Sequence, residues 1–532
     1  MRQFNTAGPT VADDHYCLDP LQRLNLDEIL KLIGDKRYFV LHAPRQTGKT
    51  TCLLALMRYL NAQGRYRAVY ANIESAQTAR NDVARGMRAV CGGIAQSVRR
   101  YLGDTSCEER WLKIFDDNGP DAALRSLLEY WTQSAPQHPA VLMLDEIDAL
   151  VGDTLISVLR QIRSGYADRP DHFPLSVILC GVRDVRDYRI HGGDGEIITG
   201  GSAFNIEAAS LVLGNFSRDD IRNLYAQLTA ETGQQFAGAI YDKLWDDTAG
   251  QPWLVNALGQ ILCFDLPEGR ERSRPLSLEL YHQAREKLIS SRTTHLDQLA
   301  DKLKEERVHR VIARILGGEI DIDTVPTDDL QYVQDLGLLT LEGPLKISNA
   351  IYREIIPREL TWTTQQLTIH EETPWYVTEK KRLDMTKLLR SFQQFFRENA
   401  DAWLQQFQYK EAGPQLLLQA FLQRIVNGGG RITREYGLGM KRMDLYLEWP
   451  LDDNLAFLGP LQRVVLELKI IRKGLAATLG EGLPQTAGYA AGCGADEAHL
   501  IIFDRSGDKE WDDRIWERSE AVNGRQVHVW GM

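Results

Sequence analysis

An apolar run, a glycine-containing loop and a helix-like segment follow one another between residues 38 and 56, and this order constrains the fold more than any other feature. The loop consists of Ala43, Pro44, Arg45, Gln46, Thr47, Gly48, Lys49 and Thr50. It has the spacing GxxxxGK[ST], except that Ala43 stands in place of the first glycine. Between a strand and a helix, such a loop surrounds a phosphate group with backbone N–H groups. The segment therefore predicts a nucleotide-phosphate site on a parallel α/β sheet.

The residues of this loop predict the chemistry of the site. We expect Lys49 to place its charge at the β- and γ-phosphate oxygens and the Thr50 hydroxyl to bind Mg²⁺, with Thr51 completing the cofactor-binding segment. Gly48 permits a close approach of the backbone to the phosphates. The alternative is an ordinary strand–turn–helix in which Lys49 is solvated.

Two further apolar runs end in charged residues. The run 141–144 ends in Asp145 and Glu146, so we expect Asp145 to hold Mg²⁺ through water and Glu146 to polarise the attacking water. The run 176–180 is followed by Arg183, which at a strand tip would reach the γ-phosphate. The alternative for Arg183 is a solvated loop position. The pattern predicts ATP hydrolysis, with ATP and Mg²⁺ as cofactors.

These motifs together resemble the AAA-like ATPases of the STAND type, including the archaeal-ATPase-like proteins. The resemblance covers about residues 1–360 and includes Gly250-Gln251-Pro252. It implies that residues 16–20 border the adenine and that Pro252 faces the nucleotide from a helical lid. It also implies a winged helix after the lid. Ala43 departs from the pattern, but a methyl group at that position should not prevent binding.

A second set of charged residues lies near the C-terminus, on expected strands. Asp444 lies in the run 442–449, and Glu467 and Lys469 share one face of the run 463–470, because residues two apart in a strand point the same way. If these strands pair, Asp444 lies beside Glu467. Two adjacent carboxylates repel each other unless a hard cation lies between them. The sequence therefore predicts a second Mg²⁺ site, with Lys469 orienting water or stabilising a phosphorane.

A helix beginning near Pro484 would present Gln485 and Tyr489 on one face. The order Asp, Glu-x-Lys, then Gln-x-x-x-Tyr resembles the PD-(D/E)XK nuclease superfamily over about residues 400–532. This resemblance implies that Asp444 and Glu467 bind metal, that Lys469 is catalytic and that Gln485 is an accessory polar group. Many members carry a further Glu on the first helix, which is absent from 414–426. Possible substitutes are Gln415, Gln419 and Glu435.

Basic residues near this set are candidates for phosphate contacts, or are plain surface charge. They are Arg431, Arg434, Lys441, Arg442 and Lys473.

The fold class expected from these features is a multidomain α/β protein. A P-loop parallel sheet has a helical lid, and a winged helix and a restriction-endonuclease-like α/β domain follow. The length of 532 residues fits several domains. The expected boundaries are 1–215 for the ATPase core, 216–264 for the lid, 276–360 for the winged helix, 361–398 for a connector and 399–532 for the nuclease-like domain.

The expected winged helix is a poor DNA reader. Its second helix, 328–336, contains three Asp and no basic residue, so it would repel a duplex. We therefore expect a scaffold, a protein partner or self-association there. The net charge of −11 excludes a uniformly basic nucleic-acid coat. Apolar runs are too short to span a membrane, no signal peptide is evident and the seven cysteines show no CxxC pair, which predicts a cytoplasmic protein.

The sequence thus predicts an ATPase whose nucleotide cycle controls a nuclease that uses Mg²⁺ or Mn²⁺. DNA is the expected substrate, in defence, repair or mobile-element processing. The alternative is a nucleotide-switched regulatory scaffold whose C-terminal domain binds nucleic acid or a partner without cutting.

Overall fold

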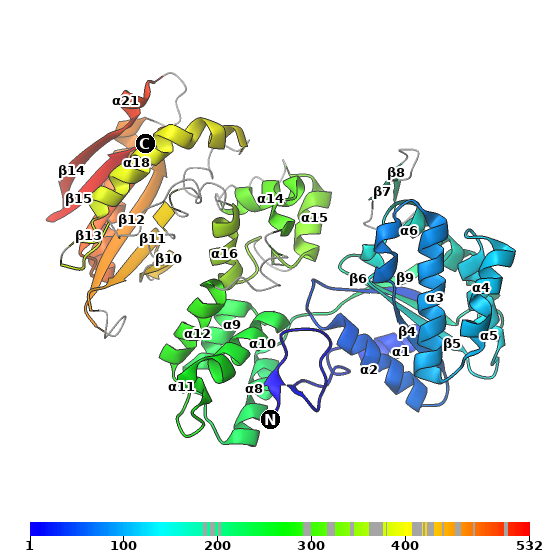
Figure 1. Ribbon diagram of the computed structural model, residues 1–532. Coiled ribbons are helices and arrows are strands. Elements are labelled where there is room, and N and C mark those ends of the chain that lie inside the picture. The colour runs from blue at the N-terminus through cyan, green and yellow to red at the C-terminus, as the bar shows by residue number, and fades with distance from the viewer. Residues whose placement is uncertain are drawn as a thin grey trace. The chain divides into compact units, whose positions relative to one another are not determined.

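The chain forms two compact units in the computed structural model (Figure 1). The first unit contains residues 1–298 and 326–352, and the second contains residues 299–325 and 353–532. The structure describes residues 1–184, 189–191, 197–199, 204–290, 299, 301–316, 325–340, 345–360, 376–378, 380–406, 418, 421–422, 430–438, 441–452, 459–471, 474–504 and 509–532.

A parallel five-stranded sheet organises the first unit. Its strands lie in the order β4-β5-β6-β3-β9. They are β3 (Tyr38–His42), β4 (Arg67–Asn72), β5 (Ala140–Asp145), β6 (Ser176–Gly181) and β9 (Glu207–Val212). Strands β3, β5 and β6 confirm the apolar runs predicted above, whereas β9 was not predicted. Neighbouring strands pair in parallel, so the ends of β3, β5 and β6 meet at one edge of the sheet.

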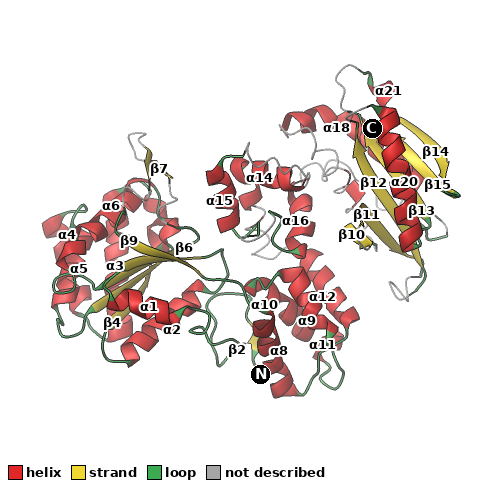
Figure 2. Cartoon of the chain, turned by 180° about the vertical axis from the view of Figure 1, so that it is seen from behind, coloured by secondary structure: helices red, strands yellow, loops and turns green. Residues whose placement is uncertain are grey.

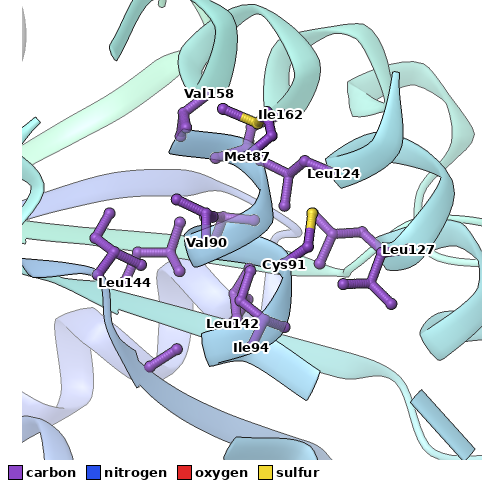
Figure 3. Packing of buried hydrophobic residues seen from close by; sticks show 14 of the residues in the cluster. Met87, Val90, Cys91, Ile94, Leu124, Leu127, Leu142, Leu144, Val158 and Ile162 are labelled. Carbon is purple, nitrogen blue, oxygen red and sulfur yellow. The ribbon is translucent and has the colours of Figure 1, made fainter. Parts of the chain in front are cut away.

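Helices cover both faces of this sheet because the strand side chains alternate. Phe39, Leu41, Val141 and Met143 contact α1 (Leu26–Gly34) and α2 (Lys49–Ala62) in one buried cluster. Leu142 and Leu144 point to the other face, where Figure 3 shows them beside side chains of three helices. These helices are α3 (Val83–Leu102), α5 (Ala123–Gln133) and α6 (Gly152–Ser164); α4 (Ser106–Asn118) packs on α3 and α5.

A group of helices follows the sheet, in the region expected to form the lid, and is called the lid below. Ser217 is the N-cap of the first of these helices: its side chain accepts a hydrogen bond from the Asp220 N–H, and the Asp220 side chain accepts one from the Ser217 N–H. The lid contains α8 (Arg218–Thr232), α9 (Ala239–Thr248), α10 (Pro252–Gln260), the π-helical turn η5 (Ile261–Asp265), α11 (Pro267–Arg270) and α12 (Leu278–Ser290). The short helix α11 begins at Pro267, which is tolerated there because the first position of a helix needs no N–H donor.

The N-terminal segment contacts the lid. Strands β1 (Gln3–Phe4) and β2 (His15–Tyr16) pair in parallel, and Phe4 packs against Tyr16 and Tyr225. Gln227 of α8 exchanges hydrogen bonds with the backbone of Cys17.

The region expected to be a winged helix contains α14 (Glu306–Leu316), α15 (Thr327–Asp335) and α16 (Ala350–Leu360). A winged helix also needs a β-hairpin after its helices. Here the described residues show one antiparallel bridge, between Leu339 and Ile347, and residues 341–344 lie outside the described part. A winged helix therefore stays a prediction. The short antiparallel pair β7 (Arg189–His191) and β8 (Ile197–Thr199) lies between β6 and β9 in the chain.

A mixed six-stranded sheet forms the core of the second unit, in the order β10-β11-β12-β13-β15-β14. Its strands are β10 (Arg431–Leu438), β11 (Lys441–Pro450), β12 (Leu461–Ile470), β13 (Glu497–Phe503), β14 (Trp516–Val522) and β15 (Arg525–Gly531). β14 and β15 were not predicted. Helix α18 (Met385–Gln406) packs on one face through Phe396 and Phe503, and α20 (Leu475–Cys493) packs on the other (Figure 2). The short helix α21 (Trp511–Arg514) precedes β14. The chain thus contains a second α/β domain at its C-terminus.

The predicted start of the last long helix was wrong. Helix α20 begins at Leu475 and carries Pro484 in its interior. Proline usually marks a helix boundary because it lacks an N–H group and its ring crowds the carbonyl four residues earlier. Here packing of the helix on the sheet outweighs that local cost. No helix among the described residues is long and apolar enough to cross a membrane.

Candidate nucleotide and metal sites

The loop between β3 and α2 has the backbone shape of a phosphate cradle. Gln46 and Gly48 have positive φ angles of 58° and 93°. The ammonium of the buried Lys49 donates hydrogen bonds to the carbonyls of Ala43 (2.8 Å) and Pro44 (3.0 Å). Lys49 thus spans the loop from the first turn of α2. A phosphate in the loop would offer this cation stronger acceptors than two neutral carbonyls.

The Arg23 side chain contacts the phosphate loop. Its guanidinium donates to the carbonyls of Thr47 (2.6 Å) and Gly214 (2.8 Å), and stacks 4.8 Å from the Phe216 ring centroid. A Cβ atom on Gly48 would lie 2.7 Å from Arg23 Nη1. Arg23 therefore links the phosphate loop to the segment that leads into the lid.

The predicted magnesium residues meet at the sheet edge. The Thr50 hydroxyl donates to Asp145 Oδ2 over 2.7 Å, and the Tyr70 hydroxyl donates to the same oxygen over 2.9 Å. Asp145 is fully buried. A hydroxyl and a buried carboxylate are the ligands that Mg²⁺ accepts beside a nucleotide, directly or through water. These residues therefore fit a magnesium ion.

Glu146 follows in a left-handed conformation, with φ 62° and ψ 41°. Its N–H donates to Asp145 Oδ1 over 3.0 Å. Burial raises the pKa of Glu146, and the Asp148 and Asp145 carboxylates add to the rise, while Lys49 and Arg45 oppose it. A raised pKa makes a carboxylate a better proton acceptor, which suits the predicted base.

Arg183 lies after β6, at the same edge, and contacts a helix. Its Nε donates to Asp335 Oδ2 of α15 over 3.2 Å, and its guanidinium lies 4.9 Å from the Tyr332 ring centroid. The turn after α15 also reaches the phosphate loop, since a Cβ on Gly337 would lie 2.7 Å from Pro44 Cγ. Arg183 is buried in this pair, so the alternative of a solvated loop arginine does not describe it. Its expected contact with a γ-phosphate stays a prediction.

A pocket of about 120 Å³ adjoins the loop. Its lining includes Tyr16, Cys17, Leu18 and Pro20 from the segment expected to border adenine, and Pro252 at the start of α10. No sequence motif indicated the N-terminal segment 5–10, yet most of its residues also line the pocket: Asn5, Thr6, Ala7, Gly8 and Thr10. Trp253 Nε1 donates to the Thr6 carbonyl (2.9 Å), and the Thr10 N–H donates to Thr51 Oγ1 (3.1 Å). This segment therefore connects the lid to the phosphate-binding helix.

The C-terminal carboxylates are brought together by strand pairing. β11 and β12 are antiparallel, with Leu445 opposite Leu466, and this register puts Asp444 next to Glu467. Tyr446 and Val465 belong to the core beneath α20, so Asp444, Glu467 and Lys469 lie on that same face. Asp444 Oδ2 accepts the Leu468 N–H over 2.8 Å.

Glu467 is nearly inaccessible, with 2% of its side chain exposed, and its Oε2 has no hydrogen-bond partner among the described residues. Burial and the Asp444 carboxylate raise its pKa to about 7, against the opposing effect of Lys469. Burial alone would lower the pKa of Lys469, but Glu467, Glu481 and Asp444 outweigh it and raise that pKa. A divalent cation would satisfy the unpaired oxygen and relieve the carboxylate repulsion.

No group of three or more His, Cys, Asp or Glu side chains suited to a metal occurs within the described ranges. The Asp444–Glu467 pair still fits Mg²⁺, which keeps several waters and commonly uses one or two protein carboxylates.

The accessory residues are only partly described. Gln485 Nε2 donates a hydrogen bond to the Tyr489 hydroxyl over 2.8 Å. Arg431 Nη1 forms an ion pair with Glu448 Oε2 at 3.7 Å. Gln415, Gln419 and Lys473 lie outside the described residues, and the side chains of Arg434, Glu435, Lys441 and Arg442 are not described. No sequence motif indicated Glu481, whose Oε1 lies 3.5 Å from Lys469 Nζ. The four-residue spacing from Glu481 to Gln485 was the available signal.

Comparisons with known proteins identify the first domain. A family model described as an AAA domain matches residues 33–188. This part of the chain is an AAA-like P-loop ATPase domain, for which ATP binding is expected. A search of curated proteins finds no significant match.

Solved structures with similarity include the Walker-type ATPase of Pyrococcus abyssi, at 12% identity and a TM-score of 0.43, covering 66% of this chain and 99% of that one. Cdc6p from Pyrobaculum aerophilum has 14% identity and a TM-score of 0.34, covering 65% and 93%. The ORC1 protein of Aeropyrum pernix, in complex with DNA, has 15% identity and a TM-score of 0.32, covering 68% and 96%.

Proposed function

We propose that the AAA-like domain binds and hydrolyses ATP and that its nucleotide cycle controls a metal-dependent nuclease in the C-terminal domain. One observation carries the nuclease half: a buried Glu467 with an unpaired oxygen lies beside Asp444 and Lys469 on one face of a sheet. A protein gains nothing in stability from such a carboxylate pair, because burial and mutual repulsion both oppose ionisation. A bound divalent cation would offset this cost, because its charge stabilises both ionised carboxylates.

In the ATPase half, each residue has a role that suits its position. Lys49 and the backbone of the loop 43–48 bind the phosphates, while Thr50 and Asp145 hold Mg²⁺, which offsets the charge that develops on them. Glu146 accepts a proton from water, and its raised pKa favours that transfer. Tyr70 keeps Asp145 oriented.

In the nuclease half, Asp444 and Glu467 hold the metal, whose chemistry is to polarise a phosphodiester oxygen and lower the pKa of bound water. The Lys469 ammonium stabilises the negative charge of the phosphorane, and Gln485 is an accessory polar group on α20. The same proposal includes a cytoplasmic location, DNA as the substrate and a partner-binding role for residues 276–360. It also places the domain boundaries at residues 215, 264, 360 and 398.

A second candidate is the nucleotide-switched scaffold, in which the C-terminal domain binds without cutting. The Arg183–Asp335 pair supports it, together with the approach of Gly337 to Pro44. Through these contacts α15 would respond directly to the occupant of the phosphate loop. Cleavage decides between the candidates, because both require ATP binding and only the first breaks a phosphodiester bond.

Replacement of Lys49 by Ala should weaken ATP binding about 100-fold, because the triphosphate loses its charge-assisted hydrogen bonds, worth roughly 2.7 kcal/mol. Nucleotide titration measures the affinity, and nicking of supercoiled plasmid with Mg²⁺ or Mn²⁺, with and without ATP, measures the coupling. In this variant nicking should no longer respond to ATP. Lys31→Ala removes an exposed lysine from α1 and should change neither result. Unaltered ATP affinity in Lys49→Ala would contradict the phosphate site.

Metal affinity at the C-terminal site should depend on pH. Since the pKa of Glu467 is raised to about 7, the carboxyl holds a proton at pH 6 that a cation must displace. Mn²⁺ should therefore bind about tenfold more weakly at pH 6 than at pH 8, where the carboxylate is already ionised. Calorimetric titration of Mn²⁺ without nucleotide measures the affinity. The binding that remains in Asp444→Asn is subtracted, so that only the C-terminal site is counted. A flat profile between these pH values would contradict the assignment of Glu467.

A further inference from the structure

We infer that Glu481 is a positioning residue of the C-terminal site, which holds the Lys469 ammonium and thereby leaves Glu467 available to a divalent cation. The inference rests on the proposed metal-dependent function and adds a residue to which the sequence pattern assigned no role. It starts from the position of the ammonium between two carboxylates. Lys469 Nζ lies 3.3 Å from Glu467 Oε1 and 3.5 Å from Glu481 Oε1.

The two carboxylates differ sharply in their surroundings. The Glu467 side chain is 2% exposed and that of Glu481 is 75% exposed, with Lys469 between them at 21%. The ammonium thus lies on the path from solvent to the buried carboxylate. Paired with Glu467 alone, it would neutralise the charge that a divalent cation needs, and it would compete with that cation for Oε1. Glu481 offers the ammonium a second partner on the solvent side.

The fold places Glu481 at this spot. Glu481, Gln485 and Tyr489 follow at intervals of four on α20, so they lie along one side of the helix. Next to Glu481, Gly482 is buried, and a Cβ atom there would lie 2.9 Å from the Leu500 side chain of β13. The glycine lets α20 approach the sheet closely at this point. The approach brings the Glu481 side chain within reach of Lys469 on β12.

The consequence for the chemistry concerns both partners of Lys469. Shared with Glu481, the ammonium remains charged and lies on the solvent side of Glu467, where a substrate phosphodiester would arrive. Because Glu481 holds the ammonium from that side, a divalent cation meets weaker competition for Oε1, and the unpartnered Oε2 is open to it. Glu481 itself touches neither metal nor substrate in this scheme. Its effect must therefore pass through Lys469.

A double-mutant cycle tests this dependence with Mn²⁺ as the probe, titrated calorimetrically into the full chain without nucleotide. Glu481→Gln should weaken Mn²⁺ binding up to about fivefold, the factor that an exposed ion pair of roughly 1 kcal/mol supports. In the Lys469→Met background, the same Glu481→Gln change should have no effect, because the ammonium that Glu481 holds is gone. Glu520→Gln, on the outer strand β14, is the matched control and should bind Mn²⁺ as the wild type does.

Each outcome has a distinct meaning. Equal weakening by Glu481→Gln in both backgrounds would overturn the inference, because Glu481 would then act on the cation directly. An unchanged affinity in the wild-type background would also overturn it. If the wild type and Asp444→Asn bind Mn²⁺ equally, the proposed metal site is wrong, and the inference fails with it. Thermal unfolding of each variant identifies any that do not fold, and Glu481→Ala then repeats the cycle.

Discussion

Replacement of Glu146 by Gln is expected to lower ATP turnover by about 10²–10⁴, the range that one general base contributes. Glutamine has nearly the shape of glutamate but cannot take a proton from water at neutral pH. The Glu146 N–H bond to Asp145 Oδ1 uses the backbone, so the substitution leaves it in place. Nucleotide affinity should therefore change by no more than about threefold, because the phosphates are held by other residues.

Phosphate release measures turnover and nucleotide titration measures affinity for this variant. Glu129→Gln, on the surface of α5 where Glu129 pairs with Arg125, makes the same chemical change away from the site and should behave as the wild type. An unchanged turnover in Glu146→Gln would show that another group is the base. A loss of both turnover and affinity would show instead that Glu146 supports the shape of the nucleotide site.

Replacement of Lys469 by Ala is expected to reduce plasmid nicking by about 10²–10³, the cost of removing one preorganised group that stabilises developing charge. Lys469 Nζ is the described cation nearest to Glu467, at 3.3 Å. ATP turnover should not change, because the ATPase residues lie in a separate compact unit. Mn²⁺ affinity should not fall, since the competing ammonium is removed.

The matched control is Lys387→Ala on α18, which packs on the face of the sheet opposite to α20. Cutting that survives Lys469→Ala would remove the catalytic assignment of this lysine. Absence of Mg²⁺- or Mn²⁺-dependent nicking by the wild type would favour the scaffold, with nucleic-acid binding then measured directly.

Local pattern was sufficient for much of the ATPase domain. Residues 43–50 are contiguous, a short apolar run precedes them and a helix-length segment follows, so strand, loop and helix could be placed together. The edge formed by β3, β5 and β6 also followed from the sequence, since parallel strands place their carboxyl ends together. Strand β9 was missed because its run is short and is preceded by a charged, glycine-rich segment without a clear period.

The C-terminal domain was predicted less completely for a different reason. The strands that carry Asp444 and Glu467 alternate clearly, and their pairing agreed with the structure. The start of α20 was misplaced because a proline within a sequence reads as a boundary, whereas burial of Thr478, Gly482 and Ala487 stabilises the helix on both sides of it.

The sequence by itself determined which residues follow one another on a strand, a loop or a helix, and therefore the phosphate loop and the order Asp, Glu-x-Lys. Tertiary structure alone decided which charges meet across the fold. Arg183 with Asp335, Tyr70 with Asp145 and Lys469 with Glu481 are 152, 75 and 12 residues apart in the chain. Periodicity reports only which face a side chain occupies, whereas these pairs depend on how helices and strands pack against one another. Burial also depends on packing and not on local sequence, because the sheet and the helix that enclose Glu467 raise its pKa.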